Sequence, residues 1–322
     1  MLGRQDLGHR VVIRRIVGSR NARPVFSDVL GELVDLTETH LTVNSANGPL
    51  RLPLAEVHRA KRVPPRRRQP SDIIALELVA NEAWPAPVQE RLGDWLLRAA
   101  DGWTGRANSA LAVGDPQRPL DDAIDAVQRW YAARGQHPLI TVPLPLAAPV
   151  ARALDARGWD ARPPVLVQTA PLAALLDAVP TRPDLPPVTL AHEPSPAWLD
   201  IVAARKGSLP DAARHVLTGV DQVRFGEVRA EGGGLLAIAR GTVTGGGRWL
   251  GLTLVEVVPE ARRRGLAQHL IRALADWAVS LGATDAFLQV EETNEPARAL
   301  YRRLGFTTHH RFVTRVAPRA GS

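Results

Sequence analysis

The fold is decided by the stretch Leu252-Thr-Leu-Val-Glu-Val-Val-Pro-Glu-Ala-Arg-Arg-Arg-Gly-Leu-Ala-Gln-His-Leu-Ile-Arg-Ala-Leu274. Residues 252–258 are mostly apolar and rich in β-branched side chains, which predicts a buried strand that ends at Pro259. Apolar residues then recur at helical spacing from residue 266 to residue 277. The stretch therefore predicts a strand, a tight turn containing Gly265, and a helix.

This turn has the features of an anion site. The first amides of a helix lack partners inside the helix and point beyond its N-terminus. Gly265 allows close approach of the backbone, Ala267 adds little bulk, and three arginines, 262–264, stand beside the opening. A pyrophosphate group fits this combination. The turn alone leaves open a second interpretation, in which it is a surface turn with solvated arginines.

A second motif follows the first. Residues 286–290 predict another strand, and Glu291-Glu-Thr-Asn294 comes directly after it. Pro296 then stands at a plausible first helical position, and the helix is expected to stop at Gly305. A final strand is expected from Phe306.

In their order and spacing, the two motifs resemble those of the GNAT acyltransferase superfamily. That family carries Arg/Gln-x-x-Gly-x-Gly/Ala after its fourth strand, which Arg262, Gly265 and Ala267 match. It then carries an Asn after its fifth strand and the pattern Ala-x-x-Leu-Tyr-x-x-x-Gly-Phe, matched by Asn294 and by residues 297–306. The resemblance covers residues 250–307 and implies acetyl-CoA as cosubstrate, an amine as acceptor, and no metal.

The resemblance also implies roles for individual residues. Backbone amides of 263–268 would hold the pyrophosphate, and backbone groups of Val257 and Val258 would hold the pantetheine arm, with one amide facing the thioester oxygen. Tyr301 occupies the position of the general acid that protonates the leaving thiolate, and Asn294 would contact the pantetheine or fix its loop. The predicted cofactor-binding residues are Val257, Val258, Arg262, Arg263, Arg264, Gly265, Leu266, Ala267, Gln268, Asn294, Ala297 and Tyr301.

The general base stays open at this point. Glu256 is the nearest candidate, although strand alternation points it to either face, and Glu291 and Glu292 are alternatives at the end of the next strand. None of the histidines considered shows a metal-ligand spacing; these are His215, His269, His309 and His310.

Length and composition narrow the class of protein. A chain of 322 residues with 45% hydrophobic content predicts two or three domains with a sizeable core. The absence of cysteine excludes disulfides, thiolate metal sites and a cysteine nucleophile. No apolar run is long enough to span a bilayer and no signal peptide is evident, so we expect a cytoplasmic enzyme without a membrane partner.

The net charge of +7 resides in the first 70 residues, since basic and acidic residues balance in the rest. Five short strand candidates and the hairpin signal Asn47-Gly48 predict a small basic β-barrel over residues 1–65, similar in strand spacing to Tudor- or Sm-like barrels. Arg66-Arg67-Arg68 lies in a basic, proline-containing linker, 66–72. Basic barrels can bind nucleic acid, but single-strand binders interleave aromatic residues and this module has only Phe26. A solvated linker and an accessory barrel are therefore favoured over a nucleic-acid contact.

Residues 73–178 repeat the order of elements found in the C-terminal unit, 188–318, with a linker at 179–187. This first copy has no glycine in 115–122, and Asp121 and Asp122 at its helix start would repel a pyrophosphate, so it is not expected to bind coenzyme A. This copy also contains a polar and aromatic cluster, which could line an acceptor pocket or pack in the core, and core packing is the favoured interpretation. The cluster comprises Trp95, Arg98, Trp103, Arg106 and Asn108.

The expected architecture is α/β (α+β): a small β-barrel followed by two GNAT-like domains with mixed, mostly antiparallel central sheets, an arrangement that resembles actinobacterial tandem-GNAT proteins. The expected function is acetyl-CoA-dependent N-acetyl transfer to a primary amine of a small molecule, peptide or protein. Two alternatives stay open: a non-catalytic acetyl-CoA-binding regulator, and a protein-lysine acetyltransferase docked through the barrel. The sequence indicates neither the acceptor nor the oligomeric state.

Overall fold

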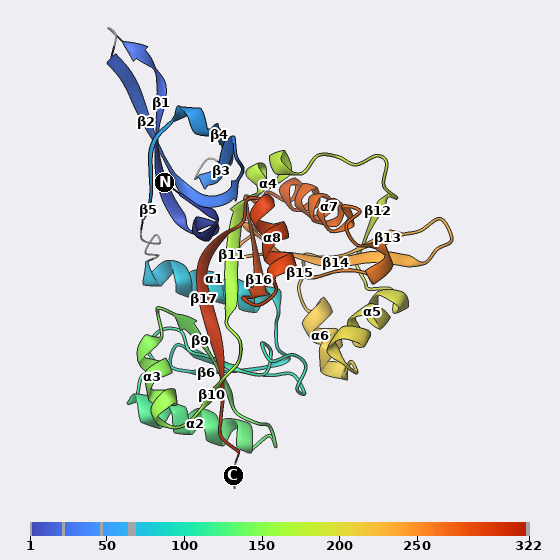
Figure 1. Ribbon diagram of the computed structural model, residues 1–322. Helices are drawn as coiled ribbons and strands as arrows, with labels where there is room; N and C mark the ends of the chain where they lie inside the picture. The colour runs from blue at the N-terminus through green and yellow to red at the C-terminus, as the bar shows by residue number, and fades with distance from the viewer. Residues whose placement is uncertain (1, 21–22, 46–47, 64–68, 320–322) are drawn as a thin grey trace.

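The computed structural model describes residues 2–20, 23–45, 48–63 and 69–319. Within these residues the chain forms a five-stranded sheet and a twelve-stranded sheet. Figure 1 shows the small sheet at the upper left, above and beside the large one, whose helices lie on both of its faces.

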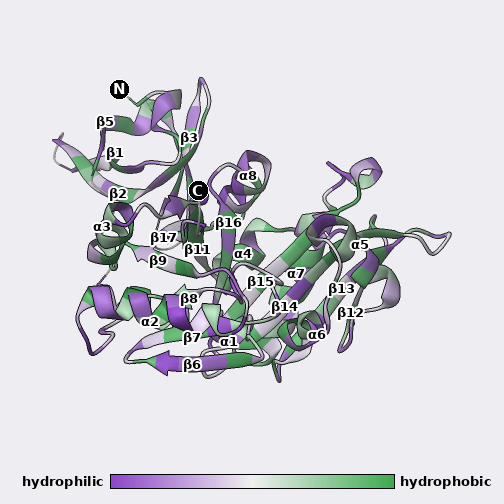
Figure 2. Ribbon diagram, turned by 90° about the horizontal axis from the view of Figure 1, so that it is seen from below, coloured by the Kyte–Doolittle hydropathy of each residue, from purple (hydrophilic) through white to green (hydrophobic). Residues whose placement is uncertain are grey.

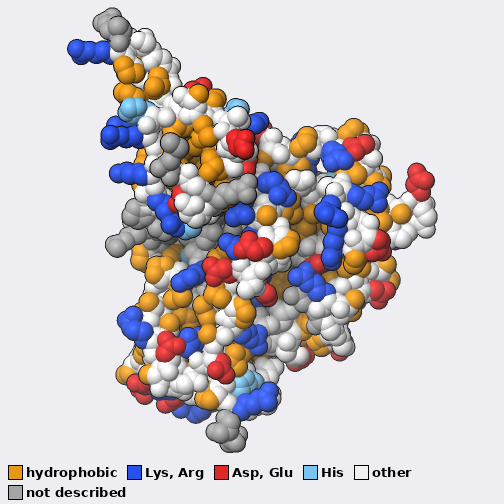
Figure 3. Space-filling model, viewed as in Figure 1, with side chains coloured by type: hydrophobic (Ala, Val, Ile, Leu, Met, Phe, Trp, Pro, Cys, Tyr) orange, Lys and Arg blue, Asp and Glu red, His pale blue; other side chains and the backbone are white. Residues whose placement is uncertain are grey.

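The small sheet is an antiparallel, barrel-like module with strand order β4-β3-β2-β1-β5. Its strands are β1 (Arg10–Arg20), β2 (Arg23–Leu36), β3 (His40–Ser45), β4 (Gly48–Pro53) and β5 (Val57–Arg62). They enclose a core of seven buried aliphatic side chains, Val11, Ile13, Val29, Leu33, Leu41, Val43 and Leu52. Figure 3 shows Lys and Arg side chains along its outer edge, in keeping with its basic composition.

The five strands predicted in this module are confirmed. Ser45 pairs with Gly48, so the predicted hairpin between β3 and β4 forms, while Asn47 itself lies outside the described residues. Arg66, Arg67 and Arg68 also lie outside them.

The first half of the large sheet follows the barrel. Its elements are α1 (Pro70–Ala83), β6 (Val88–Leu92), β7 (Trp95–Ala99), β8 (Ala110–Leu111), α2 (Leu120–Ala132), β9 (Leu139–Leu144), α3 (Ala148–Ala156), β10 (Asp160–Ala161), β11 (Val165–Pro171) and α4 (Leu172–Ala178). Helix α1 begins at Pro70, inside the expected linker 66–72. Proline suits that first helical position because its missing N–H has no intrahelical partner there.

The second half contains the motifs that decided the fold. Its elements are β12 (Val188–Ala191), α5 (Pro196–Lys206), α6 (Asp211–Thr218), β13 (Val223–Arg229), β14 (Leu235–Thr244), β15 (Trp249–Val257), the short 3-10 turn η3 (Pro259–Ala261), α7 (Leu266–Ser280), β16 (Asp285–Glu291), α8 (Glu295–Arg303) and β17 (Thr307–Val316). The strands and helices predicted from residue 252 onward form within a few residues of their expected bounds.

The two halves share one continuous sheet. Its order is β12-β13-β14-β15-β16-β11-β17-β9-β8-β7-β6, with β10 paired to β17. Strand β11 of the first half therefore lies between β16 and β17 of the second, and β17 in turn pairs with β9 of the first. The domain limits 73–178 and 188–318 accordingly stay a proposal about sequence units, since hydrogen-bonded strands cross them.

Each half contains a parallel pair of strands that is joined by a helix. In the described chain, the parallel pairs are β8 with β9 and β15 with β16, and each pair is joined by a helix, α2 or α7. All other strand pairs are antiparallel. This is the tandem, mostly antiparallel architecture that the order of elements predicted.

Helices α4, α7 and α8 cover one face of the second half, while α1, α5 and α6 lie on the other (Figure 1). Arg240 is fully buried on this second face, where its Nε donates to the Leu217 carbonyl at 2.8 Å and its Nη1 to the Ala83 carbonyl at 2.9 Å. These carbonyls lie at the C-terminal ends of α6 and α1, where a cation is favourable. Burial lowers the pKa of Arg240 to about 9. The guanidinium thus connects the first half to the second.

Figure 2 shows a largely hydrophilic β6 at the edge of the large sheet, where all but one of its side chains are exposed. A polar edge strand discourages pairing with a second sheet. In the described ranges, no helix is long and apolar enough to cross a membrane.

Candidate active site

Strands β15 and β16 separate in the middle of the second half. They pair in parallel only from Trp249 opposite Asp285 to Leu252 opposite Leu288. Leu254 has a positive φ of 52°, next to a register shift between β14 and β15, which is the signature of a β-bulge. Beyond Leu252, β15 has no strand partner on the β16 side among the described residues.

The end of β15 directs one free amide into this separation. The amide of Val258 donates to the Leu236 carbonyl at 3.0 Å, so it is already used. In the antiparallel register that pairs Val257 with Ala237, the backbone groups of Val257 consequently point away from β14. The Val257 carbonyl accepts from Nε of Arg262 at 3.3 Å. Of the two backbone positions predicted to contact the donor, Val257 is the one with an available N–H.

The turn before α7 leaves a run of backbone amides without protein partners among the described residues. Gly265 is the residue before the helix and has the left-handed φ of 89°. In the described structure, none of the amides from residue 263 to residue 268 donates to a protein acceptor, and the first that does so is His269, to the Gly265 carbonyl at 3.0 Å. The three arginines 262–264 are exposed around these amides. A run of unpartnered amides with cations beside it is suited to a phosphate group.

Asn294 fixes the start of α8. Its side-chain oxygen accepts from the Ala297 amide at 3.3 Å, a helix cap of the usual kind. This hydrogen bond holds the start of α8, while contact of Asn294 with the pantetheine stays a prediction. Ala297 lies in the first turn of α8 and packs against the main core.

Tyr301 lies on α8, half-buried against the same core, with its ring edge toward Phe306 at 5.8 Å between centroids. Burial raises the pKa of Tyr301 to about 12, and the cation of Arg205 opposes that rise. Its hydroxyl has no hydrogen-bond partner within the described part of the chain. The phenol is therefore protonated near neutral pH, as a proton donor must be.

Glu256 points to the face covered by α5, where it forms an ion pair with Arg205. The cation of Arg205 also opposes the rise in the pKa of Tyr301 that burial causes, although Tyr301 packs against the core on the α7 and α8 side of the sheet. In contrast, the side chains of Glu291 and Glu292 have no ion pair or hydrogen bond among the described residues. Sequence reasoning missed Arg205, and the only signal for it was a basic residue in the last turn of a helix.

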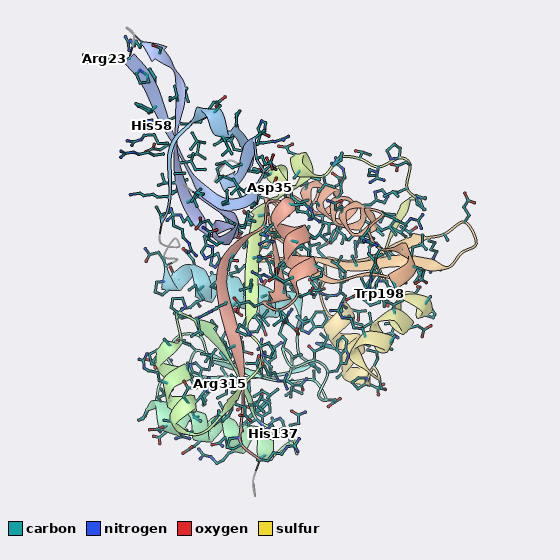
Figure 4. The ribbon with its side chains drawn as sticks, viewed as in Figure 1. Arg23, Asp35, His58, His137, Trp198 and Arg315 are labelled. Carbon is teal, nitrogen blue, oxygen red and sulfur yellow. The ribbon has the colours of Figure 1, made fainter. Side chains whose placement is uncertain are left out.

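The polar and aromatic cluster of the first half is packed or hydrogen-bonded inside the protein, although the buried Nε1 of Trp103 and Nε of Arg106 have no hydrogen-bond partner in the described residues. Trp95 is buried in the core of that half, and Arg98 donates to the Ser109 carbonyl at 2.9 Å. Asn108 accepts from the Ala100 amide at 2.8 Å. Trp103 stacks on Trp84 at 5.5 Å and shares a buried cluster with Trp198 of α5, which Figure 4 labels. Arg106 lies 5.7 Å from the ring of Trp84.

The helix start in the first half lacks the anion-binding features. Asp121 and Asp122 lie in the first turn of α2, as predicted. Arg157 pairs with Asp121 at 2.9 Å and with Asp125 at 2.5 Å, so this cation is already partnered by carboxylates of α2.

The histidines have other partners. The His269 ring is hydrogen-bonded to the Pro186 carbonyl at 3.1 Å, and His310 contacts Glu77 at 2.7 Å. In the residues that the structure describes, no group of three or more His, Cys, Asp or Glu is arranged to hold a metal ion.

Comparison with known proteins places this chain in a family. Residues 70–315 match the family described as "Probable histone acetyltransferase Rv0428c C-terminal". The protein of Mycobacterium tuberculosis named "Probable histone acetyltransferase Rv0428c" is 31% identical over 325 residues, which cover 96% of this chain and 95% of the relative. The "Uncharacterized N-acetyltransferase YobR" of Bacillus subtilis is 29% identical over 253 residues, covering 76% of this chain and 99% of the relative. The solved structure of a tandem GNAT protein from the clavulanic acid biosynthesis pathway superposes with a TM-score of 0.54 at 19% identity, covering 80% of this chain and 91% of that one.

The chain belongs to the Rv0428c C-terminal family, and it is a GNAT-type acetyltransferase with a tandem GNAT fold. Acetyl-CoA is the acetyl donor of that superfamily.

Proposed function

We propose that this chain transfers the acetyl group of acetyl-CoA to a primary amine, and that the residues of the second half do so. The observation that carries the proposal is the run of unpartnered amides from residue 263 to residue 268, next to the separated end of β15. Such amides are fixed before the ligand arrives, so they bind an anion without reorganisation.

Donor binding would use both features. The amides of 263–268 hold the pyrophosphate, with the exposed arginines 262–264 adding positive charge. The pantetheine arm then lies along the end of β15, where the free amide of Val257 faces the thioester oxygen and stabilises the negative charge that develops there.

The chemical step joins the amine nitrogen to the thioester carbon and breaks the carbon–sulfur bond. Tyr301 donates its phenolic proton to the departing thiolate and is reprotonated by the second proton that the nitrogen releases as it becomes an amide. Glu256 accepts the proton that the acceptor ammonium must lose before it attacks. Because Glu256 is paired with Arg205, we expect the acceptor ammonium to compete with the Arg205 guanidinium for this carboxylate.

The test is the release of free coenzyme A thiol in the presence of a panel of primary amines, with Tyr301→Phe as the comparison. Acceptor-dependent release that the variant loses supports the proposal. Tight acetyl-CoA binding without release for any amine would instead support a non-catalytic acetyl-CoA-binding protein.

A lysine side chain of a protein is the second candidate acceptor. It is favoured by the printed name of the mycobacterial relative, which is 31% identical over nearly the whole chain. Mass spectrometry of a lysine-rich histone incubated with enzyme and acetyl-CoA tests it. Acetylated lysines that depend on Tyr301 support this acceptor, and turnover of small amines alone excludes it.

A further inference from the structure

The linker between the two halves passes over the start of α7. A Cβ built on Gly265 would lie 2.8 Å from Nη1 of Arg182 and 3.8 Å from Cδ1 of Leu185. The guanidinium of Arg182 thus lies against the glycine that opens the helix. The sequence predicts residues 179–187 as a linker and gives Arg182 no role in the site.

This linker is held in place on both sides of Arg182. Upstream, Arg272 of α7 donates to the Leu176 carbonyl at 3.0 Å and also to the Val179 carbonyl. Downstream, the His269 ring is hydrogen-bonded to the carbonyl of Pro186. The linker is therefore already ordered in the folded protein. Little further conformational entropy of the backbone is lost when Arg182 binds a ligand at the start of α7.

Arg182 is engaged by a neighbouring carboxylate. Its Nε and Nη2 donate to the two oxygens of Asp184 at 2.7 and 2.6 Å. The side chains are 37% and 61% exposed, so this pair contributes little to the stability of the fold. A guanidinium fork that holds two carboxylate oxygens presents the geometry that also binds two phosphate oxygens. The Arg182 cation lowers the pKa of Asp184 to about 2, so the carboxylate is charged at any ordinary assay pH.

We propose that Arg182 is a ligand of the acetyl-CoA pyrophosphate, and that Asp184 occupies the Arg182 guanidinium until the pyrophosphate displaces it. The inference rests on the proposed function, which places the pyrophosphate on the amides at the start of α7. It adds a binding residue contributed by the linker, and an internal competitor that weakens donor binding.

The experiment is calorimetric titration of the full-length protein with acetyl-CoA, using Arg182→Ala, Asp184→Ala and the double variant. Arg182→Ala should raise the Kd roughly tenfold, the size of one charge-assisted contact. Asp184→Ala should lower it about threefold, as expected for release of an exposed ion pair. The double variant should match Arg182→Ala, because Asp184 acts only through Arg182.

A matched control comes from the barrel. Arg14 and Asp28 form a similarly exposed pair with two hydrogen bonds, of 2.8 and 2.9 Å. Arg14→Ala removes the same charge from a position in a different module, so it should leave the Kd unchanged. A tenfold loss in this control as well would mean that net charge alone is responsible, and the inference would fail.

Dephospho-CoA, which lacks the 3′-phosphate, identifies the phosphate that is bound. Arg182→Ala should weaken binding of this ligand as much as that of coenzyme A, and a loss confined to coenzyme A would overturn the assignment to the pyrophosphate. A wild-type Kd in Arg182→Ala, or weaker binding in Asp184→Ala, would also overturn it. If the wild-type protein bound no acetyl-CoA, the proposed function would fail first and the inference with it.

Discussion

The side-chain amide of Asn44, on strand β3 of the barrel, donates a hydrogen bond of 3.1 Å to the backbone carbonyl of Arg302 on helix α8. Arg302 is the residue after Tyr301, so the barrel contacts the helix that carries the proposed general acid. Asn44 is 4% exposed, and its contact is therefore part of the packed interface between the barrel and the second half. The barrel thus supports α8 directly.

Replacement of Asn44 tests this support. Asn44→Ala should cost about 1 kcal/mol of stability and lower kcat more than it changes the Kd for acetyl-CoA, because it loosens α8 and leaves the helix start of α7 intact. Thermal unfolding and steady-state kinetics measure the two effects. Arg51→Ala, an exposed change on the neighbouring strand, is the control, and equal effects of the two variants would contradict the role of Asn44.

Glu32 gives the same interface a dependence on pH. Burial raises the pKa of Glu32 from 4.5 to about 7, although the nearby cations of Arg302 and Arg298 oppose that rise. The folded protein therefore binds this proton more tightly than the unfolded chain does, and its stabilising contribution is full below pH 4.5 and is lost as the pH rises through about 7. Glu32→Gln lacks this titration. The melting temperature of the variant relative to that of the wild type should therefore increase as the pH rises from 5 to about 7.5. Parallel melting curves across this range would refute the prediction.

Tyr301→Phe removes the proton donor and keeps the ring. We expect kcat to fall by at least about 100-fold, the usual size of general-acid catalysis, with an unchanged Kd for acetyl-CoA. Because the pKa of Tyr301 is about 12, deprotonation of this residue should not lower wild-type activity below about pH 10. A variant with near-normal kcat would show that the thiolate leaves without help from this phenol.

The general base can be identified by comparing three isosteric variants. Glu256→Gln should lower kcat by roughly 100-fold, because its carboxylate lies on the separated end of β15, where the proposed thioester binds, and accepts the proton of the ammonium. Glu291→Gln and Glu292→Gln should change kcat by no more than about threefold, an effect that would reflect only altered local charge. A large loss in either of these two, with Glu256→Gln active, would move the base to the end of β16.

The sequence alone predicted those elements whose structure depends on residues close to one another in the chain. Residues 252–306 contain their own strand, turn, caps and helices, and Gly265, Asn294 and Tyr301 lie where those patterns predict. The five barrel strands were predictable for the same reason, since alternation and hairpin signals act over a few residues.

The remaining features depend on contacts between distant segments. The order of strands along the chain is the same whether β11 closes its own half or enters the other, so insertion of β11 between β16 and β17 could not be predicted. The positions of Arg205 beside Glu256 and of Arg182 over Gly265 likewise depend on how α5 and the linker pack. These charged side chains carry no sequence pattern that distinguishes them from other surface arginines.

The most direct test of the central claim is calorimetric titration of acetyl-CoA into the wild-type protein and into Gly265→Glu. This substitution forces a side chain into a left-handed position and places a carboxylate among the amides of residues 263–268. We predict one site per chain in the wild type and none in the variant, because the helix start in the first half carries Asp121 and Asp122 instead of a glycine turn. Two sites in the wild type, or one site that survives in Gly265→Glu, would contradict the account.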